Sequence, residues 1–380
     1  MREVNFKHTE IGLIPHDWEV KTLGKISTLI NGRAFCQAEL LNNGKYKVLR
    51  VGNFFSNDSW YYSDLELDEK LYCEIGDLLY AWSCTYGAYI WKEPKTIFHY
   101  HIWKVLPEDV EKKFLFYVLN NDTEKQRKTS QGSTMSHITK GFMENRKFAL
   151  PPTLAEQERI AGALSSIDTL IGALNEQIEK KRHIKQGTMQ DLLTAKRRLK
   201  GFTGEWTSKQ IIEIVGKIKR GQSLQSKDYK KGDIPVVAGG KQYAGFHNVA
   251  NHHGRTITIS GSGANAGYVS FHANPIFATD CSVIDDKGNF DLLFIYYVLQ
   301  QRQNDIYKLQ SGGAQPHIYP KNIEDIVSIF PPTLAEQNAI ANILSSMDTE
   351  ITNLEQKRNK YIVIKQGMMQ NLLTGKIRLI

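Results

Sequence analysis

The stretch Pro151-Pro152-Thr153-Leu154-Ala155-Glu156-Gln157 returns 180 residues later (331 − 151) as Pro331-Pro332-Thr333-Leu334-Ala335-Glu336-Gln337. The match continues without a gap from 151–199 to 331–379, and about 29 of the 49 aligned positions are identical. Agreement over this length indicates an internal duplication, so the chain is expected to contain two equivalent structural repeats.

Each copy carries the signal for the start of a helix. The paired prolines favour extended backbone ahead of a helix. Thr153 and Thr333 stand in the N-cap position, and Glu156 and Glu336 follow three residues later, which is the spacing of a capping box. We expect a helix to begin after each proline pair, with the threonine accepting from one backbone N–H and the glutamate from another.

Beyond the caps, apolar residues recur alternately three and four residues apart, a period typical of a coiled-coil seam. The seam residues are Ile160, Leu164, Ile167, Ile171, Leu174 and Ile178 in the first copy, and Ile340, Leu344, Met347, Ile351 and Leu354 in the second. Arg358 and Lys365 interrupt the second seam. Because an exposed seam needs a partner, we predict two helices of about 42 residues, roughly 63 Å long, that pair antiparallel.

The segments outside the repeats share a frame but differ in most residues. Strand-like runs occupy 46–51, 77–82 and 255–260, short helices are expected at 113–119 and 293–299, and polar glycine-containing loops lie at 130–138 and 311–318. We predict a mixed α/β (α+β) fold with a pseudo-two-fold internal repeat. Its globular domains are 1–150 and 200–330, and its long spacer helices lie at 151–199 and 331–380.

Composition sets limits on the class of protein. The formal net charge is +8, which favours a polyanionic partner, and the apolar runs are too short to cross a membrane. The first seven residues lack the apolar region of a signal peptide, so a cytoplasmic protein is expected. Cys36, Cys73, Cys84 and Cys281 have no metal-ligand spacing, so we interpret them as reduced core thiols and predict no metal site.

No motif for catalysis stands out. The Pro-Pro-Thr segments at 151–153 and 331–333 lack the acid or amide and the aromatic residue of an aminomethyltransferase motif. The run from Gly261 to Gly267 fits no dinucleotide or phosphate loop and is interpreted as a turn between strands. The run from Asp17 to Lys21 lacks the separate acidic residue of a nuclease site. We therefore predict no catalytic residue in this chain.

Side chains suited to reading DNA bases occur in loops of both domains, because arginine or lysine pairs with guanine and asparagine or glutamine with adenine. The candidates are Arg33, Arg50, Asn53, Gln131, Ser133, Thr134 and His137 in the first domain, and Arg220, Gln222, Lys241, Gln242, Arg255, Asn265, Gln315 and His317 in the second. Phosphate contacts are expected from neighbouring lysines, namely Lys45, Lys140, Lys219 and Lys230.

The Pro-Pro-x-Leu-Ala-Glu-Gln openings, the heptad helices, the Leu-Leu-Thr endings at 192–194 and 372–374 and the two-fold repetition resemble the specificity subunits of type I restriction–modification systems. The resemblance implies a non-catalytic subunit that binds double-stranded DNA. Each domain would read one half of a split site, and the helices would set the gap. It also implies two modification subunits that use S-adenosylmethionine and, in systems that cleave, restriction subunits that use ATP and magnesium.

The same resemblance implies docking surfaces for modification subunits on the exposed helix faces, and Arg159, Glu179, Asn338 and Gln356 are the candidates. It also implies that the end of the second helix meets residues 1–20. Three other hypotheses stay open: a DNA-binding regulator or architectural protein without enzyme partners, a spacer between two protein partners, and a self-contained methyltransferase. Co-purification of a modification subunit and salt-dependent binding to DNA would discriminate among them.

Overall fold

The computed structural model describes residues 5–54, 57–83, 85–129 and 137–380. Two compact units divide the chain. Unit 1 comprises Met1–Leu174 and Lys357–Ile380, and unit 2 comprises Asn175–Gln356. Because these boundaries cut both long helices near their middles, each unit combines a globular part with one half of each helix. Unit 2 is one continuous stretch of chain, whereas unit 1 is built from two.

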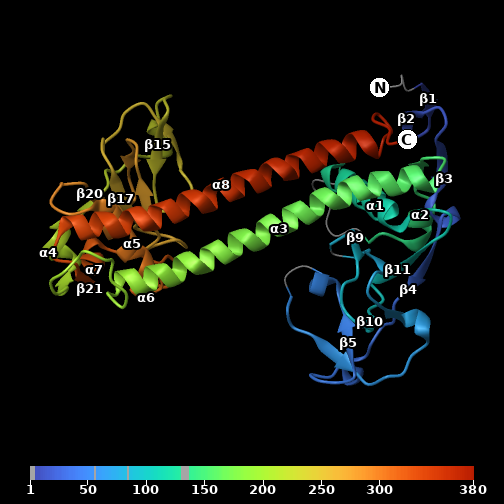
Figure 1. Cartoon of the computed structure of the whole chain (residues 1–380), viewed down its shortest axis with the longest axis horizontal. Helices are drawn as coiled ribbons and strands as arrows, with labels where there is room; N and C mark the ends of the chain where they lie inside the picture. The colour runs from blue at the N-terminus through green and yellow to red at the C-terminus, as the bar shows by residue number, and fades with distance from the viewer. Residues whose placement is uncertain (1–4, 55–56, 84, 130–136) are drawn as a thin grey trace. The chain divides into compact units, whose positions relative to one another are not determined.

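The two long helices are α3 (Leu154–Leu193) and α8 (Leu334–Leu372), and both begin directly after a Pro-Pro-Thr segment, as predicted (Figure 1). In unit 1, Asp168 of α3 forms an ion pair with Lys365 of α8 at 2.7 Å. In unit 2, Lys185 of α3 pairs with Asp348 of α8 at 2.5 Å. The early part of each helix thus lies against the late part of the other, which confirms the antiparallel pairing.

The predicted seam is unevenly buried. Ile160, Leu164, Leu174, Ile178, Ile340, Leu344 and Ile351 are buried. Ile167, Ile171, Met347 and Leu354 are only half-buried. Ile160, Leu164, Ile340 and Leu344 are buried within the globular cores, whereas Leu174, Ile178 and Ile351 are buried outside them, so the pairing of the helices itself contributes to burial.

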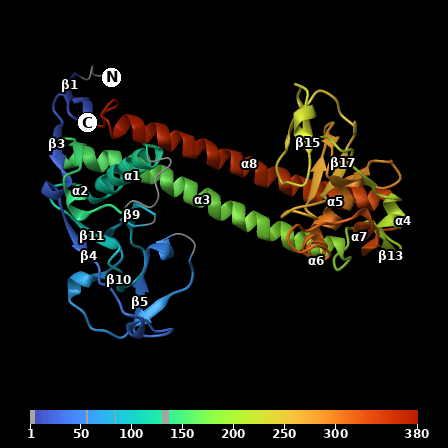
Figure 2. The same ribbon diagram turned by 180° about the vertical axis from the view of Figure 1, so that it is seen from behind.

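The globular part of unit 1 is built on small sheets. An antiparallel sheet has the order β4 (Ser27–Asn31), β11 (Ile102–Pro107), β8 (Leu78–Ala81), β9 (Gly87–Ile90). A second sheet has the order β6 (Tyr61–Ser63), β5 (Tyr46–Leu49), β10 (Thr96–Phe98), β7 (Tyr72–Cys73), with β5 and β10 parallel. Two-stranded pairs join β1 (Phe6–Thr9) to β2 (Gly12–Pro15) and β3 (Glu19–Thr22) to β12 (Lys147–Leu150). The helices are α1 (Lys112–Thr129) and α2 (Lys140–Glu144), and α1 lies beside α3 in both views (Figures 1 and 2).

Unit 2 repeats this plan. Its larger sheet has the order β14 (Lys219–Arg220), β20 (Cys281–Asp285), β17 (Thr256–Ser260), β18 (Val269–His272). Its smaller sheet has the order β16 (Gly245–His247), β15 (Ile234–Val237), β19 (Phe277–Ala278), and β13 (Thr207–Gln210) pairs with β21 (Val327–Phe330). The short helices are α4 (Ile211–Val215), α5 (Leu292–Gln301), α6 (Gln303–Lys308) and α7 (Pro320–Glu324). Short 3-10 helices occupy Leu23–Lys25, Gln37–Glu39, Val51–Phe54 and Glu69–Leu71 in unit 1, and Ser226–Asp228 in unit 2.

The core of each unit includes the ends of the long helices. In unit 1, Ile160 and Leu164 of α3 and Leu372 of α8 belong to the same buried cluster as Trp18 and Phe114. In unit 2, Leu192 and Leu193 of α3 join Ile340 and Leu344 of α8 in a cluster with Phe294. The helices are therefore integral parts of both cores, and the mixed α/β prediction with a repeated architecture is confirmed.

One part of the cysteine interpretation is wrong. Cys73 and Cys281 are buried thiols, but Cys36 is exposed, because it lies at the start of a short 3-10 helix at the surface. Cys84 lies outside the described residues. Over the part of the chain that is described, no helix is long and apolar enough to span a membrane.

Candidate nucleic-acid interface

A repeated polar triad fixes each globular part to the long helices. In unit 1, the hydroxyl of Tyr117 on α1 donates to Asp168 (2.8 Å), which also pairs with Lys365. The hydroxyl of Tyr297 on α5 donates in the same way to Asp348 (2.8 Å), the partner of Lys185. Burial, and next the neighbouring carboxylate, raise the pKa of both tyrosines. Lys365 therefore interrupts the seam because its ammonium group has a carboxylate to bind.

The expected reciprocal capping box is only half formed. Thr153 and Thr333 accept from the backbone N–H groups of Glu156 (3.2 Å) and Glu336 (3.3 Å). The two glutamate side chains, 2% and 0% exposed, do not return to the N-cap. Each binds an arginine from the segment that follows the other helix, because a guanidinium satisfies a buried carboxylate with two bonds and opposite charge.

These arginines occupy equivalent positions in the repeat. Arg378 donates to Glu156 through Nε (2.5 Å) and Nη2 (2.8 Å), and Arg198 donates to Glu336 through the same atoms (both 2.8 Å). Arg378 also binds both carboxylate oxygens of Asp17 at 2.7 and 2.8 Å. That bonding lowers the pKa of Asp17. The end of the second repeat thus contacts residues 1–20, as the resemblance implied.

Three predicted base readers of unit 1 are already engaged within the chain. Arg33 forms a two-bond ion pair with Glu39 and lies 4.9 Å from the ring of Phe35. Its guanidinium lowers the pKa of Glu39 to about 2. Arg50 donates to the carbonyl of Ser59, and Asn53 bonds to the backbone at 50, 57 and 59. These side chains hold loops in shape, so contacts with bases would require them to leave their present partners.

His137 lies at a surface that the sequence did not reveal. The surface consists of Trp82, His99, Tyr100, His101 and His137, and we call it the loop-end surface of unit 1. Trp82 lies within 6.0 Å, ring centre to ring centre, of Tyr100, His101 and His137. Three other predicted readers, Gln131, Ser133 and Thr134, lie outside the described residues.

The candidates of unit 2 separate into two regions. Gln315 and His317 lie beside the turn that holds Asn265. Ser262 forms an isolated antiparallel β-bridge with His317, and the N–H of Gly263 donates to the carbonyl of Pro316. Arg220 stacks on Tyr319, and the N–H of Gln222 donates to Ala278. Lys241 lies 5.2 Å from the ring of Tyr268, with exposed Gln242 next to it. Arg255 is apart from this group, since it pairs with Asp286 at the opposite end of β17.

Corresponding backbone hydrogen bonds form around His137 in unit 1 and around His317 in unit 2. The N–H of Trp82 donates to His101 (3.1 Å), and the N–H of Gly261 donates to Asp280 (3.0 Å). Ile138 donates to Trp82, and Ile318 donates to Gly261. We call Gly261, Ser262, Thr279, Asp280 and His317 the loop-end surface of unit 2.

A glycine is required beside each loop-end surface. A Cβ on Gly32 would clash with the backbone carbonyl of His99, and a Cβ on Gly221 would clash with that of Thr279. The backbone N–H of Gly32 donates to the carbonyl of Ile102, the first residue of β11, and that of Gly221 donates to the carbonyl of Cys281, the first residue of β20. The two units therefore preserve one backbone arrangement and vary the side chains on it, as expected for two readers of different sequences.

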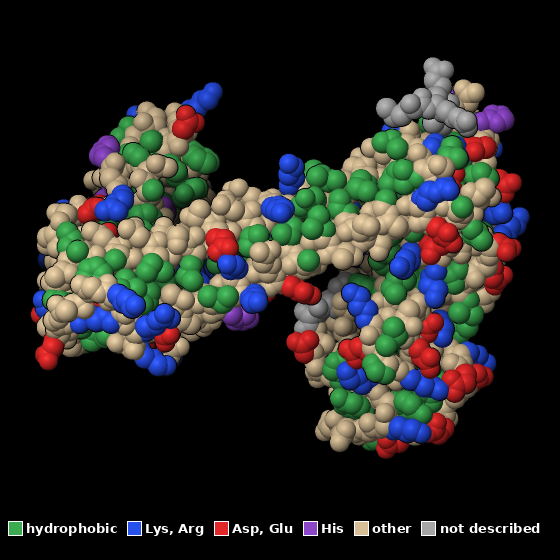
Figure 3. Space-filling view, in the orientation of Figure 1, with side chains coloured by type: hydrophobic (Ala, Val, Ile, Leu, Met, Phe, Trp, Pro, Cys, Tyr) green, Lys and Arg blue, Asp and Glu red, His purple; other side chains and the backbone are tan. Residues whose placement is uncertain are grey.

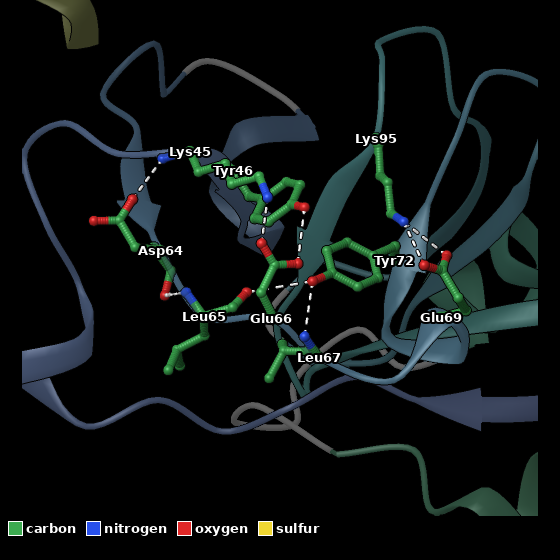
Figure 4. A network of polar contacts seen from close by, with 10 residues as sticks. Lys45, Tyr46, Asp64, Leu65, Glu66, Leu67, Glu69, Tyr72 and Lys95 are labelled. Atoms are coloured by element: carbon green, nitrogen blue, oxygen red, sulfur yellow. Dashed lines mark hydrogen bonds and ion pairs between the residues drawn. The ribbon is translucent and has the colours of Figure 1, made fainter.

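The lysines predicted to contact phosphate differ in whether a carboxylate of the chain already binds them. Lys45 is bound to Glu66 in the network of Figure 4, where Tyr46 also donates to Glu66 and Lys95 pairs with Glu69. Lys140 lies 3.6 Å from Glu144. Lys219 and Lys230 of unit 2 are exposed, and no ion pair joins either to another residue within the described ranges. Figure 3 shows basic and acidic side chains interspersed over the visible face of unit 1.

Among the residues that the structure describes, no cluster of three or more His, Cys, Asp or Glu side chains could hold a metal ion. The imidazoles of the loop-end surface of unit 1 are instead held among aromatic rings. Burial lowers the pKa of His99 to about 4 and also lowers that of His101. At neutral pH these two rings are uncharged, so they are suited to ring contacts rather than to binding phosphate.

The family of type I restriction modification DNA specificity domains matches the chain twice, over residues 15–181 and 203–363. The chain belongs to this family. The two matches correspond to the two repeats and cover most of the sequence. Each match includes one globular part and most of the long helix that follows it.

Curated relatives align over nearly the whole length of this specificity-domain protein. It is 27% identical over 428 residues to a putative type I restriction enzyme MjaX specificity subunit of Methanocaldococcus jannaschii, covering 99% of this chain and 97% of the relative. It is also 27% identical over 417 residues to the MjaVIII specificity subunit of that organism, with 99% and 97% coverage. The fold matches the crystal structure of a type I system S subunit from M. genitalium with a TM-score of 0.70 and 18% identity, over 98% of this chain and 97% of the other.

Proposed function

We propose that this chain is the non-catalytic DNA specificity subunit of a type I restriction–modification complex. Residues 1–150 and 200–330 act as its two target-recognition domains, and 151–199 and 331–380 are spacer helices. The observation that carries the proposal is the repeated backbone of the two loop-end surfaces, which present different side chains on one scaffold. Family membership and the names of the curated relatives support it.

The chemistry of the complex resides on partner subunits. Two modification subunits using S-adenosylmethionine would methylate DNA, and restriction subunits using ATP and magnesium would cleave it in a system that cuts. A relevant solved structure concerns complex assembly and conformational transition of the type I system, and its TM-score with this chain is 0.51. We propose that the complex acts in the cytoplasm, together with these partners and the DNA.

The residues first chosen as docking candidates have unequal support. Arg159 donates to the carbonyl of Leu379 and Glu179 pairs with Arg182, whereas Asn338 and Gln356 are exposed. Two copies of one partner need two similar surfaces, so docking residues should be exposed and identical in both repeats. Ile184 and Ile364 meet both conditions, at 44% and 38% exposure.

The glycines that follow these isoleucines support the same assignment. Gly187 and Gly367 lie inside α3 and α8, and no atom of the chain would contact a Cβ placed on either. A glycine inside a helix costs about 1 kcal/mol relative to alanine, so its presence in both copies needs a reason. Close approach of a partner helix supplies one. We propose that each modification subunit packs a helix on one of these Ile–Gly surfaces.

Charge placed on the docking surfaces should prevent assembly. Ile184→Glu or Ile364→Glu alone should leave one modification subunit per chain, and the double variant none, because burying a carboxylate without a partner is unfavourable. Analytical ultracentrifugation of the mixed subunits gives the stoichiometry. Val363→Glu is the control, because Val363 is 66% exposed and its counterpart in the other repeat is His183. Unchanged two-to-one assembly of the double variant would refute this surface.

The proposed function is tested with the full chain, its modification subunit and duplex DNA. Sequencing of methylated DNA should show one bipartite motif. For a duplex that carries this motif, the logarithm of the binding constant should fall linearly with the logarithm of the salt concentration. A chain that binds DNA but never co-purifies with a modification subunit would instead be a regulator or architectural protein. A chain without salt-dependent binding would not be a DNA reader.

A further inference from the structure

The loop-end surface of unit 1 differs in chemistry from its counterpart although most of the backbone hydrogen bonds correspond. Matching hydrogen bonds align Trp82 with Gly261, His99 with Thr279, and His101 with Asp280. The backbone N–H of His99 donates to the carbonyl of Leu49, at the end of β5, and that of Thr279 donates to the carbonyl of Val237, at the end of β15, both at 2.9 Å. Between His99 and His101 unit 1 has one additional residue, Tyr100, which is 39% exposed. At the three aligned positions unit 1 therefore presents rings and unit 2 presents glycine, threonine and aspartate, while both units keep a histidine at 137 or 317.

Two of the rings are held in place by hydrogen bonds of their polar atoms. The indole Nε1 of Trp82 donates to the carbonyl of Tyr100 (2.9 Å), and its ring stacks on Trp103 at 5.6 Å between ring centres. Nδ1 of His137 lies 3.2 Å from the hydroxyl of Ser83. The neighbouring guanidinium of Arg33 is paired with Glu39. Among the described residues of this surface, none is an amide or guanidinium side chain, the two-pronged groups that read adenine and guanine.

Two of the imidazoles, those of His99 and His101, are also uncharged near pH 7. Burial and neighbouring imidazoles lower the pKa values of His99 and His101, so both are neutral near pH 7. A neutral aromatic surface gains little from phosphate contacts, which depend on lysine and arginine. Its favourable interactions are apolar contacts with ring edges and faces.

In a duplex the base faces are stacked, and the apolar group that distinguishes a base pair at the major-groove edge is the 5-methyl group of thymine. We propose that unit 1 recognises its half of the DNA site by apolar contact of Trp82, Tyr100 and His101 with thymine methyl groups. The inference deepens the proposed function and rests on it. Unit 2 has no equivalent of these three rings, because Gly261 and Asp280 take the places of Trp82 and His101 and no residue corresponds to Tyr100.

Deoxyuridine substitution tests the inference without changing the protein. Deoxyuridine pairs as thymine does but lacks the methyl group. The half-site read by unit 1 is identified first, with a chain whose residues 1–150 are replaced by those of a relative. The half of the methylated motif that changes in this chain is the half that unit 1 reads. In the complex with the modification subunit, deoxyuridine in that half should weaken binding by about fourfold for each methyl group buried against a ring. Deoxyuridine in the other half should leave the affinity unchanged.

A variant of the protein assigns the contact to the rings. Tyr100→Ala should weaken binding to the thymine-containing half-site and reduce the effect of deoxyuridine there. Ile75→Ala is the matched control, because Ile75 is an exposed apolar residue that precedes β8 whereas Trp82 follows it. The control should retain the full deoxyuridine effect. Binding to the other half, read by unit 2, shows that the variant chains are folded.

The outcomes separate this inference from the proposed function. A wild-type complex with no bipartite motif contradicts the proposed function itself. A wild-type complex that has a motif, but whose unit 1 half lacks thymine or is insensitive to deoxyuridine, overturns the inference alone. It is also overturned if Tyr100→Ala, with normal binding to the other half, responds to deoxyuridine as the wild type does.

Discussion

Replacing Arg378 by alanine should destabilise unit 1 by about 3–5 kcal/mol, the usual cost of leaving a buried charge without its partner. Arg378 makes two bonds to Glu156 and two to Asp17, and Glu156 is almost completely buried. Without the guanidinium, that carboxylate has to be dehydrated with no opposite charge nearby. Urea unfolding followed by tryptophan fluorescence measures the loss, since Trp18, Trp60, Trp82, Trp91 and Trp103 all belong to unit 1.

Two further variants identify the cause. Arg378→Ala combined with Glu156→Gln should recover part of the loss, because an amide costs less to bury than a carboxylate. Arg159→Ala removes an exposed arginine that contacts the carbonyl of Leu379, and it should change stability by no more than about 0.5 kcal/mol. If Arg378→Ala unfolds at the same urea concentration as the wild type, the buried ion pair does not stabilise the unit as argued.

Lengthening both helices by four residues should abolish methylation at the original site and create methylation at a new one. Insertion after Leu174 in α3 and after Gln356 in α8 leaves both cores intact. Four residues add one turn, about 6 Å, and return the seam to nearly the same face. Base pairs are spaced about 3.4 Å apart, so the gap between unchanged half-sites should grow by one or two base pairs.

Methylome sequencing of cells that express the lengthened chain with its modification subunit measures the gap directly. Insertion in α3 alone is the control, because it shifts the two helices out of register and should yield no regular new motif. Methylation that continues at the original spacing in the doubly lengthened chain would show that the helices do not set the gap.

The long helices could be predicted because two independent signals coincide in them. The Pro-Pro-Thr starts and the heptad spacing specify elements that begin where expected, at Leu154 and Leu334. The roles of Glu156 and Glu336 could not be predicted, since their partners Arg378 and Arg198 are distant in sequence. A local pattern suggests a local bond, whereas burial at the domain core favours the stronger partner from the other helix.

The candidate interface was harder to predict for a physical reason. Arg33 and Arg50 have side chains that can read bases. In the folded loops, however, Arg33 pairs with Glu39 and Arg50 donates to the carbonyl of Ser59, and loop conformation does not follow from the sequence. Trp82 and Tyr100 resemble core aromatics in the sequence, and only the strand pairing shows that they meet at a surface. The duplication held one usable signal, because the shared His137 and His317 mark equivalent corners in both units.

The division of the units has a consequence for synthesis on the ribosome. Unit 2 is complete once Gln356 has emerged, but the core of unit 1 waits for Met369, Leu372 and Leu373. At ordinary translation speeds of about 5–20 residues per second, the nascent first portion spends roughly 10–40 s without its last helix. The half of the chain made first is thus the half that matures last, and its exposed apolar face is a natural client for chaperones during that delay.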